Sequence, residues 1–193
     1  VASRAFTGLQ PATYNIAESA PAGWVQSGAT CDNGANPASI SLAPGATVRC
    51  VFTNTQQSSI TVVKQATGGD GGFTFTSNLQ GAATFDLTTL GGVAQQHFMG
   101  LAAGTYSVSE TVPAGWNLTS ATCTDGSNPG AIDLAAGEDV TCTFANVKRG
   151  SLTVVKSTVG GDGVFTFTSA ALGGFVIATA NGTGQQSFAN LTP

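Results

Sequence analysis

The sequence has few charged side chains, and this scarcity limits the partners that the chain can have. Asp, Glu, Lys and Arg make up 8% of its 193 residues, against about 25% in typical globular domains. The six basic residues form no patch, whereas binding to nucleic-acid phosphates requires clustered Lys and Arg. No apolar run approaches the roughly 18 residues of a membrane helix. We therefore expect neither a nucleic-acid partner nor membrane insertion of this segment.

Glycine and small or β-branched residues dominate the composition instead. The chain contains 26 glycines, is 41% hydrophobic and carries a net charge of −4. Disordered chains usually combine low hydrophobicity with high net charge, so this composition indicates a folded protein. Because such a mixture favours short strands joined by glycine-rich turns, we expect an all-β fold.

An internal repeat of 92 residues organises the whole chain. The tetrapeptide PAGW occurs twice, with its tryptophans at Trp24 and Trp116, an offset of 92 positions (116 − 24). The register holds without a gap over residues 13–77 against residues 105–169. Phe98 matches Phe188 at an offset of 90 (188 − 98), so the third copy lacks two residues. A period this long corresponds to one small domain rather than to a turn of a solenoid.

The phase of the repeat predicts the domain organisation. The first residues, VASRAFTGL, and the last, SFANLTP, both match the middle of a repeat. We expect residues 1–57 to be the C-terminal half of one repeat, residues 58–149 a complete repeat, and residues 150–193 the N-terminal half of a third. Two interpretations stay open. The chain is a window of a longer array, or it is a subunit whose half-domains are completed by its neighbours, head to tail.

Strand signals recur within each copy. Alternation of apolar and polar residues predicts strands at Ile60–Lys64, Gly72–Thr76, Thr105–Glu110 and Val140–Asn146. Clusters that contain glycine or Asn-Pro predict turns between them, and no segment shows a sustained helical stripe. About seven short strands per repeat predict an immunoglobulin-like sandwich of two sheets.

The four cysteines form a repeated pattern, two per copy and nineteen positions apart (50 − 31 and 142 − 123). Zinc binding is the rival interpretation, but the chain has no CxxC pair and a single histidine, His97. We therefore expect disulfides Cys31–Cys50 and Cys123–Cys142, no metal site and no cofactor. A closed loop of this size stabilises by roughly 3 kcal/mol in the chain-entropy model. Disulfides require an oxidising compartment, so we expect an extracellular or cell-surface protein.

Three polar residues fall in phase with the apolar positions of their strands. Lys64, Glu110 and Asn146 each lie two positions beyond an apolar residue on the same strand face. The equivalents in the partial repeats, 92 positions away, are Lys156, Glu18 and Asn54. Because charged residues are so scarce in this chain, their recurrence in register is informative. We expect all three side chains to point toward the core, near one pole of the sandwich.

Such a buried cluster has two chemical interpretations. Burial lowers the pKa of a lysine and raises that of a glutamate, so a neutral amine can lie beside a protonated carboxyl. The Lys64 amine would then attack the side-chain carbonyl carbon of Asn146, Glu110 would transfer protons, and ammonia would leave. The product is an isopeptide bond, formed once per domain. The alternative is a buried Lys–Glu ion pair in which the asparagine satisfies backbone groups.

Three segments, ITVVK, GTYSVSETVPAGW and VTCTFANVK, carry a resemblance to a known family. They resemble the B-type repeats of collagen-binding surface adhesins and the SpaA-like pilin domains, which have a prealbumin-like (CnaB-type) fold. In that family the first strand carries the reactive lysine, the YxVxE strand the catalytic glutamate, and the last strand the reactive asparagine. The resemblance implies a Lys64–Asn146 crosslink with Glu110 as the proton shuttle. It implies parts of the same site in the partial repeats, at Glu18, Asn54 and Lys156.

Two smaller signals favour structural roles. Asp70 and Asp162 lie in GGDG segments, which we interpret as turns because calcium requires more oxygen ligands than these supply. His97 has Ala5 and Ser187 as its repeat equivalents, so we expect a surface residue there.

The pattern as a whole favours a structural protein over an enzyme. No Ser/His/Asp set recurs between copies, and the only chemistry that we expect is the single-turnover crosslink. We expect tandem domains that form an extracellular stalk, fibre or filament, with other copies of the chain as partners. An adhesin module that binds carbohydrate or a host protein through its loops is the alternative. An accessory domain beside an enzyme is a third hypothesis.

Overall fold

The computed structural model describes residues 2–192, which form strands, turns and loops. Within this range there is no helix long and apolar enough to cross a membrane. In chain order the strands are β1 (Ala12–Tyr14), β2 (Trp24–Cys31), β3 (Ile40–Leu42), β4 (Cys50–Gln56), β5 (Ser58–Thr67), β6 (Gly72–Ser77), β7 (Thr84–Thr88), β8 (Val93–Leu101), β9 (Gly104–Tyr106), β10 (Val108–Thr111), β11 (Trp116–Cys123), β12 (Ile132–Leu134), β13 (Asp139–Lys148), β14 (Gly150–Ser157), β15 (Val164–Ser169), β16 (Gly173–Ala178) and β17 (Thr183–Leu191).

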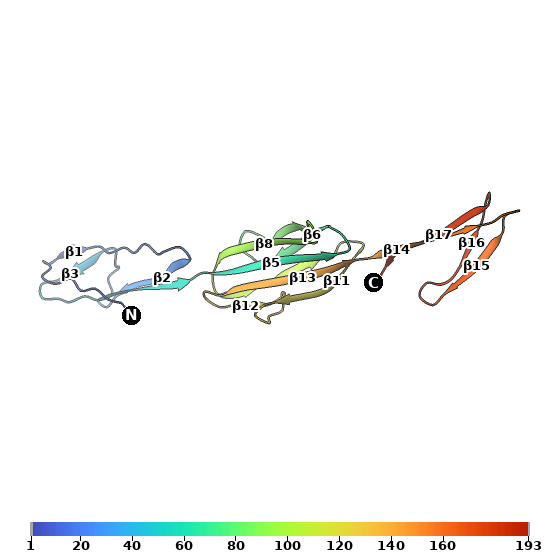
Figure 1. Ribbon diagram of the computed structural model, residues 1–193. Helices are drawn as coiled ribbons and strands as arrows, with labels where there is room; N and C mark the ends of the chain where they lie inside the picture. The colour runs from blue at the N-terminus through green and yellow to red at the C-terminus, as the bar shows by residue number, and fades with distance from the viewer. Residues whose placement is uncertain (1, 193) are drawn as a thin grey trace.

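These strands form three units in a row along an elongated molecule (Figure 1). The N-terminal unit (residues 2–56) holds β1–β4, the central unit (residues 58–148) holds β5–β13, and the C-terminal unit (residues 150–192) holds β14–β17. A single residue joins neighbouring units, Gln57 between β4 and β5 and Arg149 between β13 and β14. The two terminal units therefore lie at opposite ends of the molecule, with the central unit between them.

The central unit is built around a four-stranded sheet with the order β11-β13-β5-β8. Its other sheets are β10-β6-β7 and the two-stranded β12-β9. The first and last strands of the unit, β5 and β13, pair in parallel, with Ile60 opposite Val140 and Lys64 opposite Phe144. Because parallel strands run the same way, the chain enters the unit at one pole and leaves it at the other. This pairing explains why the three units lie in a row.

The core of the central unit lies between its sheets because apolar side chains alternate along the strands. Ile60 and Val62 of β5 are fully buried, as is Phe75 of β6. The Phe75 ring stacks on Phe85 with 5.2 Å between centroids and meets Phe144 of β13 edge-on at 5.1 Å. Full burial of one such side chain stabilises by roughly 1.5–3 kcal/mol. These aromatic contacts join the two layers of the sandwich.

One predicted strand, Thr105–Glu110, is interrupted in the structure. The strand is interrupted at Ser107. Its backbone N–H donates to Asn78 Oδ1 at 2.7 Å, and its carbonyl oxygen accepts a hydrogen bond from the Asn78 backbone N–H. These bonds take Ser107 out of the ladder, so β9 pairs with β12 while β10 pairs with β6. The break contributes to a total of nine strands in the central unit, compared with the about seven expected for such a sandwich.

The terminal units repeat the two halves of the central unit. In the N-terminal unit β2 pairs with β4 and β1 with β3, as β11 pairs with β13 and β9 with β12. In the C-terminal unit β14 pairs with β17 and β15 with β16, as β5 pairs with β8 and β6 with β7. Residues 16–19, the equivalent of β10, form no strand. The partner of β10 is β6, which has no counterpart in the N-terminal unit.

The two residues that the third copy lacks lie in a turn between strands. Phe167 stacks on Phe175 with 5.1 Å between centroids, as Phe75 stacks on Phe85. The first pair is eight positions apart (175 − 167) and the second ten (85 − 75). The shortening therefore falls in the connection of β15 to β16, equivalent to that of β6 to β7, and leaves the strands themselves intact.

Candidate functional site

Lys64 is fully buried on β5, between Val62 and Ala66 on the inward-facing side of that strand. Its Nζ atom lies 3.3 Å from Glu110 Oε2 and donates to the carbonyl oxygen of Phe144 at 3.1 Å. It also lies 4.3 Å from the centroid of the Phe73 ring. The three contacts come from three different strands, so the amine is held at one point inside the sandwich.

Glu110 reaches the same point from another sheet. It lies on β10 opposite Phe75 of β6, and its side chain is fully buried against Lys64. The break at Ser107 permits this placement, because it moves β10 away from the pairing of β9. One carboxylate oxygen of Glu110 contacts Lys64 and the other contacts Asn146, so this side chain bridges the two residues.

Asn146 completes the cluster from β13. It lies two residues beyond Phe144, the residue opposite Lys64, and is 1% exposed. Its Nδ2 atom donates to Glu110 Oε1 at 2.5 Å. Across residues 2–192, the buried side-chain polar atoms without a hydrogen-bond partner are Oδ1 of Asn146 and Oδ1 of Asn54. Such unpaired groups are rare in native structures, and each requires an explanation.

Burial also controls the charge of the cluster. It lowers the pKa of the Lys64 amine below its usual value, because the interior solvates charge poorly. The adjacent Glu110 carboxylate acts in the opposite direction, but the effect of burial is larger. The lowered pKa makes loss of a proton from this amine, which gives the nucleophilic form, easier than it is in water. The site thus brings together an amine, a carboxyl group and an amide carbonyl that accepts no hydrogen bond.

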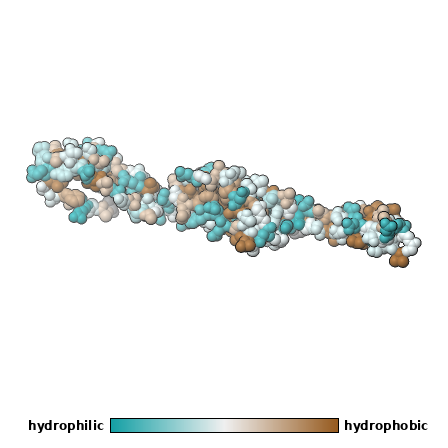
Figure 2. All heavy atoms as spheres, turned by 90° about the horizontal axis from the view of Figure 1, so that it is seen from above, coloured by the Kyte–Doolittle hydropathy of each residue, from teal (hydrophilic) through white to brown (hydrophobic). Residues whose placement is uncertain are grey.

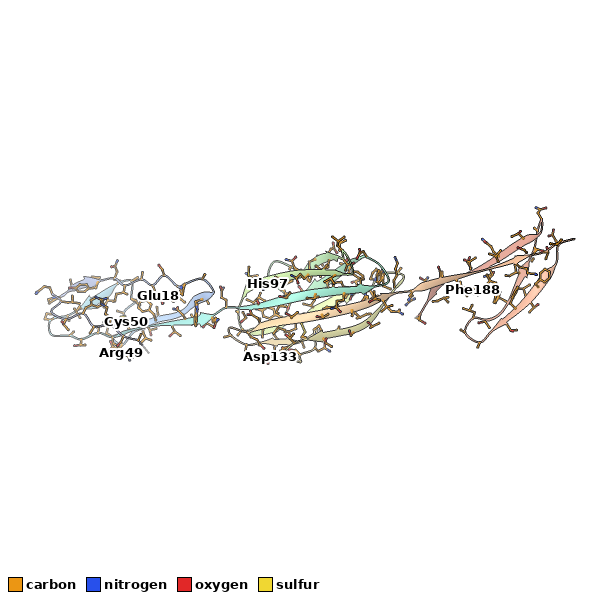
Figure 3. The ribbon with its side chains drawn as sticks, viewed as in Figure 1. Glu18, Arg49, Cys50, His97, Asp133 and Phe188 are labelled. Carbon is orange, nitrogen blue, oxygen red and sulfur yellow. A yellow bond between two sulfur atoms is a disulfide. The ribbon has the colours of Figure 1, made fainter. Side chains whose placement is uncertain are left out.

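The N-terminal unit holds the glutamate and the asparagine of an equivalent cluster. Asn54 Nδ2 donates to Glu18 Oε1 at 2.6 Å, and Asn54 Oδ1 is unpaired as in the central unit. Asn54 lies on β4, and Glu18 lies in the segment equivalent to β10, on the side of this unit that faces the central unit (Figure 3). Residues 1–57 contain no lysine, so this unit lacks the third member of the cluster.

The C-terminal unit holds the lysine of the cluster. Lys156 lies on β14, with Nζ 4.4 Å from the centroid of the Phe165 ring, as Lys64 Nζ lies over Phe73. The two phenylalanines are 92 positions apart (165 − 73), the same offset as the two lysines (156 − 64). We did not predict this ring as part of the site, although its place in the repeat register was a usable signal.

Two disulfides lie on the asparagine-bearing strands. Cys123 and Cys142 are bonded and stand opposite each other on β11 and β13. Cys31 and Cys50 are bonded in the same way on β2 and β4. Each bond ties the strand that carries Asn146 or its equivalent to an antiparallel neighbour.

The remaining residues singled out from the sequence have structural surroundings. Asp70 accepts hydrogen bonds from the backbone N–H groups of Gly92 and Gly91, which lower the pKa of its carboxyl. Asp162 makes the equivalent bonds in the C-terminal unit. His97 is exposed on β8 (Figure 3). In the described part of the chain, no group of three or more His, Cys, Asp and Glu side chains is placed to hold a metal ion.

Comparison with known proteins agrees with this architecture. The model of the prealbumin-like fold domain matches residues 1–56 and 60–148. Among solved structures, the chain is similar to the major pilin protein T-13 of Streptococcus pyogenes, with 17% sequence identity, a TM-score of 0.29, and coverage of 74% of this chain and 68% of that chain. No curated protein matches the sequence. The family match spans more than half of the residues, and the chain therefore belongs to the prealbumin-like fold domain family.

Proposed function

We propose that the chain is an extracellular structural protein, made of tandem domains that are each closed by a disulfide and by an autocatalytic Lys–Asn isopeptide bond. One observation carries this proposal. The fully buried Lys64 amine lies 3.3 Å from Glu110, whose second oxygen lies 2.5 Å from the Asn146 amide. The two disulfides support an oxidising compartment, outside the cell or at its surface. A stalk, fibre or filament is the form that such a domain array takes.

The reaction balances with the residues of the cluster alone. The lone pair of Lys64 Nζ attacks Cγ of Asn146, and the proton lost by the amine passes through Glu110 to Asn146 Nδ2. The bond between Cγ and Nδ2 then breaks, and ammonia leaves with that proton. One amide replaces another, so the step consumes no oxidant, reductant or cofactor.

Glu110 has a second role as the group that polarises the amide. Its carboxyl group contacts the amide of Asn146 at 2.5 Å, so it lies beside the group that reacts. Rotation of the Asn146 amide by half a turn exchanges its oxygen and nitrogen. The proton that Glu110 takes from the amine would then lie next to Oδ1 and stabilise the charge that develops there during attack.

A permanent ion pair with a structural asparagine is the alternative use of the same contacts. In that arrangement Asn146 Oδ1 stays buried and unpaired, which costs about 1–3 kcal/mol. Burial also lowers the pKa of Lys64 and so makes the ammonium that an ion pair requires less favourable than it is in water. Both features favour the isopeptide.

The place of the bond in the fold supports a mechanical role. Lys64 and Asn146 lie on the first and last strands of the central unit, which are adjacent and parallel. A pulling force that enters at Ser58 and leaves at Lys148 would run through the bond. The strands between the two residues would then carry no tension and could not be drawn out.

A binding module is the second candidate, and one observation favours it. The connection of β6 to β7 spans residues 78–83, whereas the equivalent connection of β15 to β16 spans residues 170–172. Loops that vary on a constant scaffold are frequent sites of recognition. Binding of the chain to a glycan or matrix protein that is lost when residues 78–83 are replaced by residues 170–172 would support this function.

Peptide mapping of the full chain tests the isopeptide. The chain is denatured, fully reduced and digested, and we expect a branched peptide that joins Lys64 to Asn146 with the loss of one ammonia. The Glu110→Gln variant keeps the shape of the side chain but cannot transfer protons, so its digest should contain the two peptides separately. Separate peptides from the wild-type chain would leave the disulfide as the only covalent closure and would favour the binding module.

A further inference from the structure

A hollow lies where the N-terminal and central units meet. Its volume is about 390 Å³, and its lining includes Gly23 of the N-terminal unit, the connecting residue Gln57, and His97, Met99 and Asp139 of the central unit. Figure 3 shows His97 toward the end of the central unit that faces the N-terminal unit. Ligand sites occur preferentially in concave surfaces between domains. The chemistry of the lining side chains therefore determines which ligand the hollow can take.

The His97 and Met99 side chains lie together on one face of β8. One residue separates them, Phe98, which pairs with Ile60 of β5. Successive side chains of a strand point to opposite faces, so His97 and Met99 share the face opposite to Phe98, with their Cα atoms roughly 6–7 Å apart. Both side chains are exposed, Met99 to 75%, on an outer surface of mixed polar and apolar residues (Figure 2). An imidazole and a thioether can therefore approach the same point in the hollow.

A β-bulge in β8 lies at Met99. Ser59 of β5 faces two residues of β8 there, Met99 and Gly100. Gly100 has a φ of 74°, in the left-handed region, and its carbonyl oxygen accepts a hydrogen bond from Gln57 Nε2 at 3.3 Å. Bulges redirect side chains and occur frequently beside functional sites. This bulge places Met99 at the hollow, which it lines.

A carboxylate lines the same hollow. Asp139 lies on β13 next to Ser59 of β5, and its Oδ1 atom accepts a hydrogen bond from Ser59 Oγ at 2.5 Å. This bond fixes the carboxylate at the hollow, and none of the described residues that line the hollow is basic. The negative charge there is thus not balanced by a neighbouring side chain and attracts a cation. The equivalent residue in the N-terminal repeat is Thr47 (139 − 92), so this charge is specific to the central copy.

The histidine and the methionine are also specific to the central copy. His97 is the only histidine and Met99 the only methionine among the 193 residues. In β17, which pairs with β14 as β8 pairs with β5, Ser187 and Ala189 stand at their positions. The strand forms there with neither residue. The fold therefore does not require a histidine and a methionine at this place, and their presence together beside one hollow indicates a ligand.

We propose that His97 and Met99 bind a copper(I) ion, with the carboxylate of Asp139 beside it as the balancing charge. Thioether ligands select soft ions such as Cu(I), and imidazole also suits copper, whereas calcium and magnesium require oxygen ligands. A zinc site needs a full set of His, Cys or acidic ligands, and the hollow offers His97 and Asp139 alone. All four cysteines lie in disulfides, so no thiol competes for the ion. The inference does not depend on the proposed isopeptide bonds.

NMR of the full chain tests the site directly, because the single histidine and the single methionine each give unique resonances. The chain is titrated with Cu(I), kept reduced by ascorbate in the absence of oxygen, and separately with Ag(I), a soft ion that undergoes no redox change. We expect one ion per chain and joint shifts of the His97 ring protons and the Met99 methyl group. Zn²⁺ at the same concentration should leave the Met99 methyl resonance in place.

The matched variants carry the residues that the other copies have at these positions. They are His97→Ser, Met99→Ala and Asp139→Thr, and competition with a chromophoric Cu(I) chelator measures their affinity. His97→Ser and Met99→Ala should each bind at least about tenfold more weakly, since loss of a residue that only supports a ligand already has an effect of this size. Asp139→Thr should have a smaller effect that fades at high salt. Gln95→Ser, on the same face of β8 but outside the hollow, is the control and should bind as the wild type does.

Wild-type affinity in the Met99→Ala chain overturns the inference, and so does a shift of the His97 resonances without the Met99 methyl group, since either result means that the imidazole binds alone. Displacement of Cu(I) by equimolar Zn²⁺ overturns the choice of ion. An unchanged urea transition in each variant shows that lost affinity reports a lost ligand rather than unfolding. The Lys64–Asn146 peptide, sought in the same chains, tests the proposed function separately, because its absence would leave the copper site standing.

Discussion

Asn54 Nδ2 lies 2.6 Å from Glu18 Oε1 in a unit that contains no lysine and lacks half the strands of a complete domain. The corresponding contact in the central unit, between Asn146 and Glu110, measures 2.5 Å. The asparagine and the glutamate therefore come together without the lysine. In the central unit Lys64 thus meets an acceptor whose geometry is set by the other two side chains, which is the condition for a fast reaction between bound groups.

Loss of the crosslink should destabilise the central unit. The bond closes a loop of 82 residues (146 − 64), for which the chain-entropy model gives about 4.5 kcal/mol. We expect Glu110→Gln to lower the free energy of unfolding by roughly that amount, measured by urea denaturation. Glu18→Gln is the matched control, since it lies outside the central unit and should leave this transition in place. Equal urea midpoints for Glu110→Gln and wild type would contradict a structural crosslink.

Removal of the central disulfide should have a smaller effect. Replacement of Cys123 and Cys142 by alanine opens a loop of nineteen residues, worth about 3 kcal/mol in the same model. The Glu110→Gln background isolates this contribution from that of the isopeptide. Replacement of Cys31 and Cys50 serves as the control, because their disulfide lies in the N-terminal unit. A larger loss from the control pair than from Cys123 and Cys142 would contradict the assignment.

The buried amine should make stability depend on pH once the crosslink is blocked. Asn146→Ala removes the carbonyl and leaves Lys64 unlinked. Because burial lowers the pKa of Lys64 in the folded state, the unfolded chain binds more protons between that value and the usual value of about 10.4. Stability should therefore rise with pH in this window and level off above it. Urea midpoints over a pH series measure the rise, and adding Lys64→Met should abolish it. A profile that falls as pH increases through this window would show a raised pKa instead.

Equivalent aromatic residues should differ in their contribution to stability according to how deeply they are buried. Phe75 is fully buried between Phe85 and Phe144, so Phe75→Ala should cost about 3–5 kcal/mol. Phe167, its equivalent in the C-terminal unit, is only half-buried. In this chain Phe167→Ala should therefore change thermal unfolding much less. Similar losses for both substitutions would mean that the C-terminal unit already has a closed core.

The repeat register made the fold and the composition of the cluster accessible from the sequence. Lys64 and Asn146 stand in phase with buried neighbours on strands of clear alternation, and both prove to be fully buried. The same residue types recur 92 positions away. This recurrence distinguishes a repeated site from a coincidental pattern in one copy. The prealbumin-like fold expected from these segments is confirmed by the family match.

The interruption of the strand at Ser107 could not be predicted from the sequence. The alternation of apolar and polar residues continues through Thr105–Glu110 without interruption. The break in the strand depends on hydrogen bonds between Ser107 and Asn78, which is distant in sequence. The contact of Lys64 with the Phe144 carbonyl likewise depends on the parallel register of β5 and β13. Pairings between remote segments leave little trace in local periodicity, which is why these features required the structure.

The adjacency of β5 and β13 also determines when a unit can fold. Residues that touch across this pair, such as Lys64 and Phe144, are 80 positions apart. Contacts of such long range form late, because the chain between them must first be ordered. During synthesis the core of the central unit cannot close before its last strand has emerged. The units of a growing chain therefore fold one after another, each once the last strand of its own repeat has been synthesised.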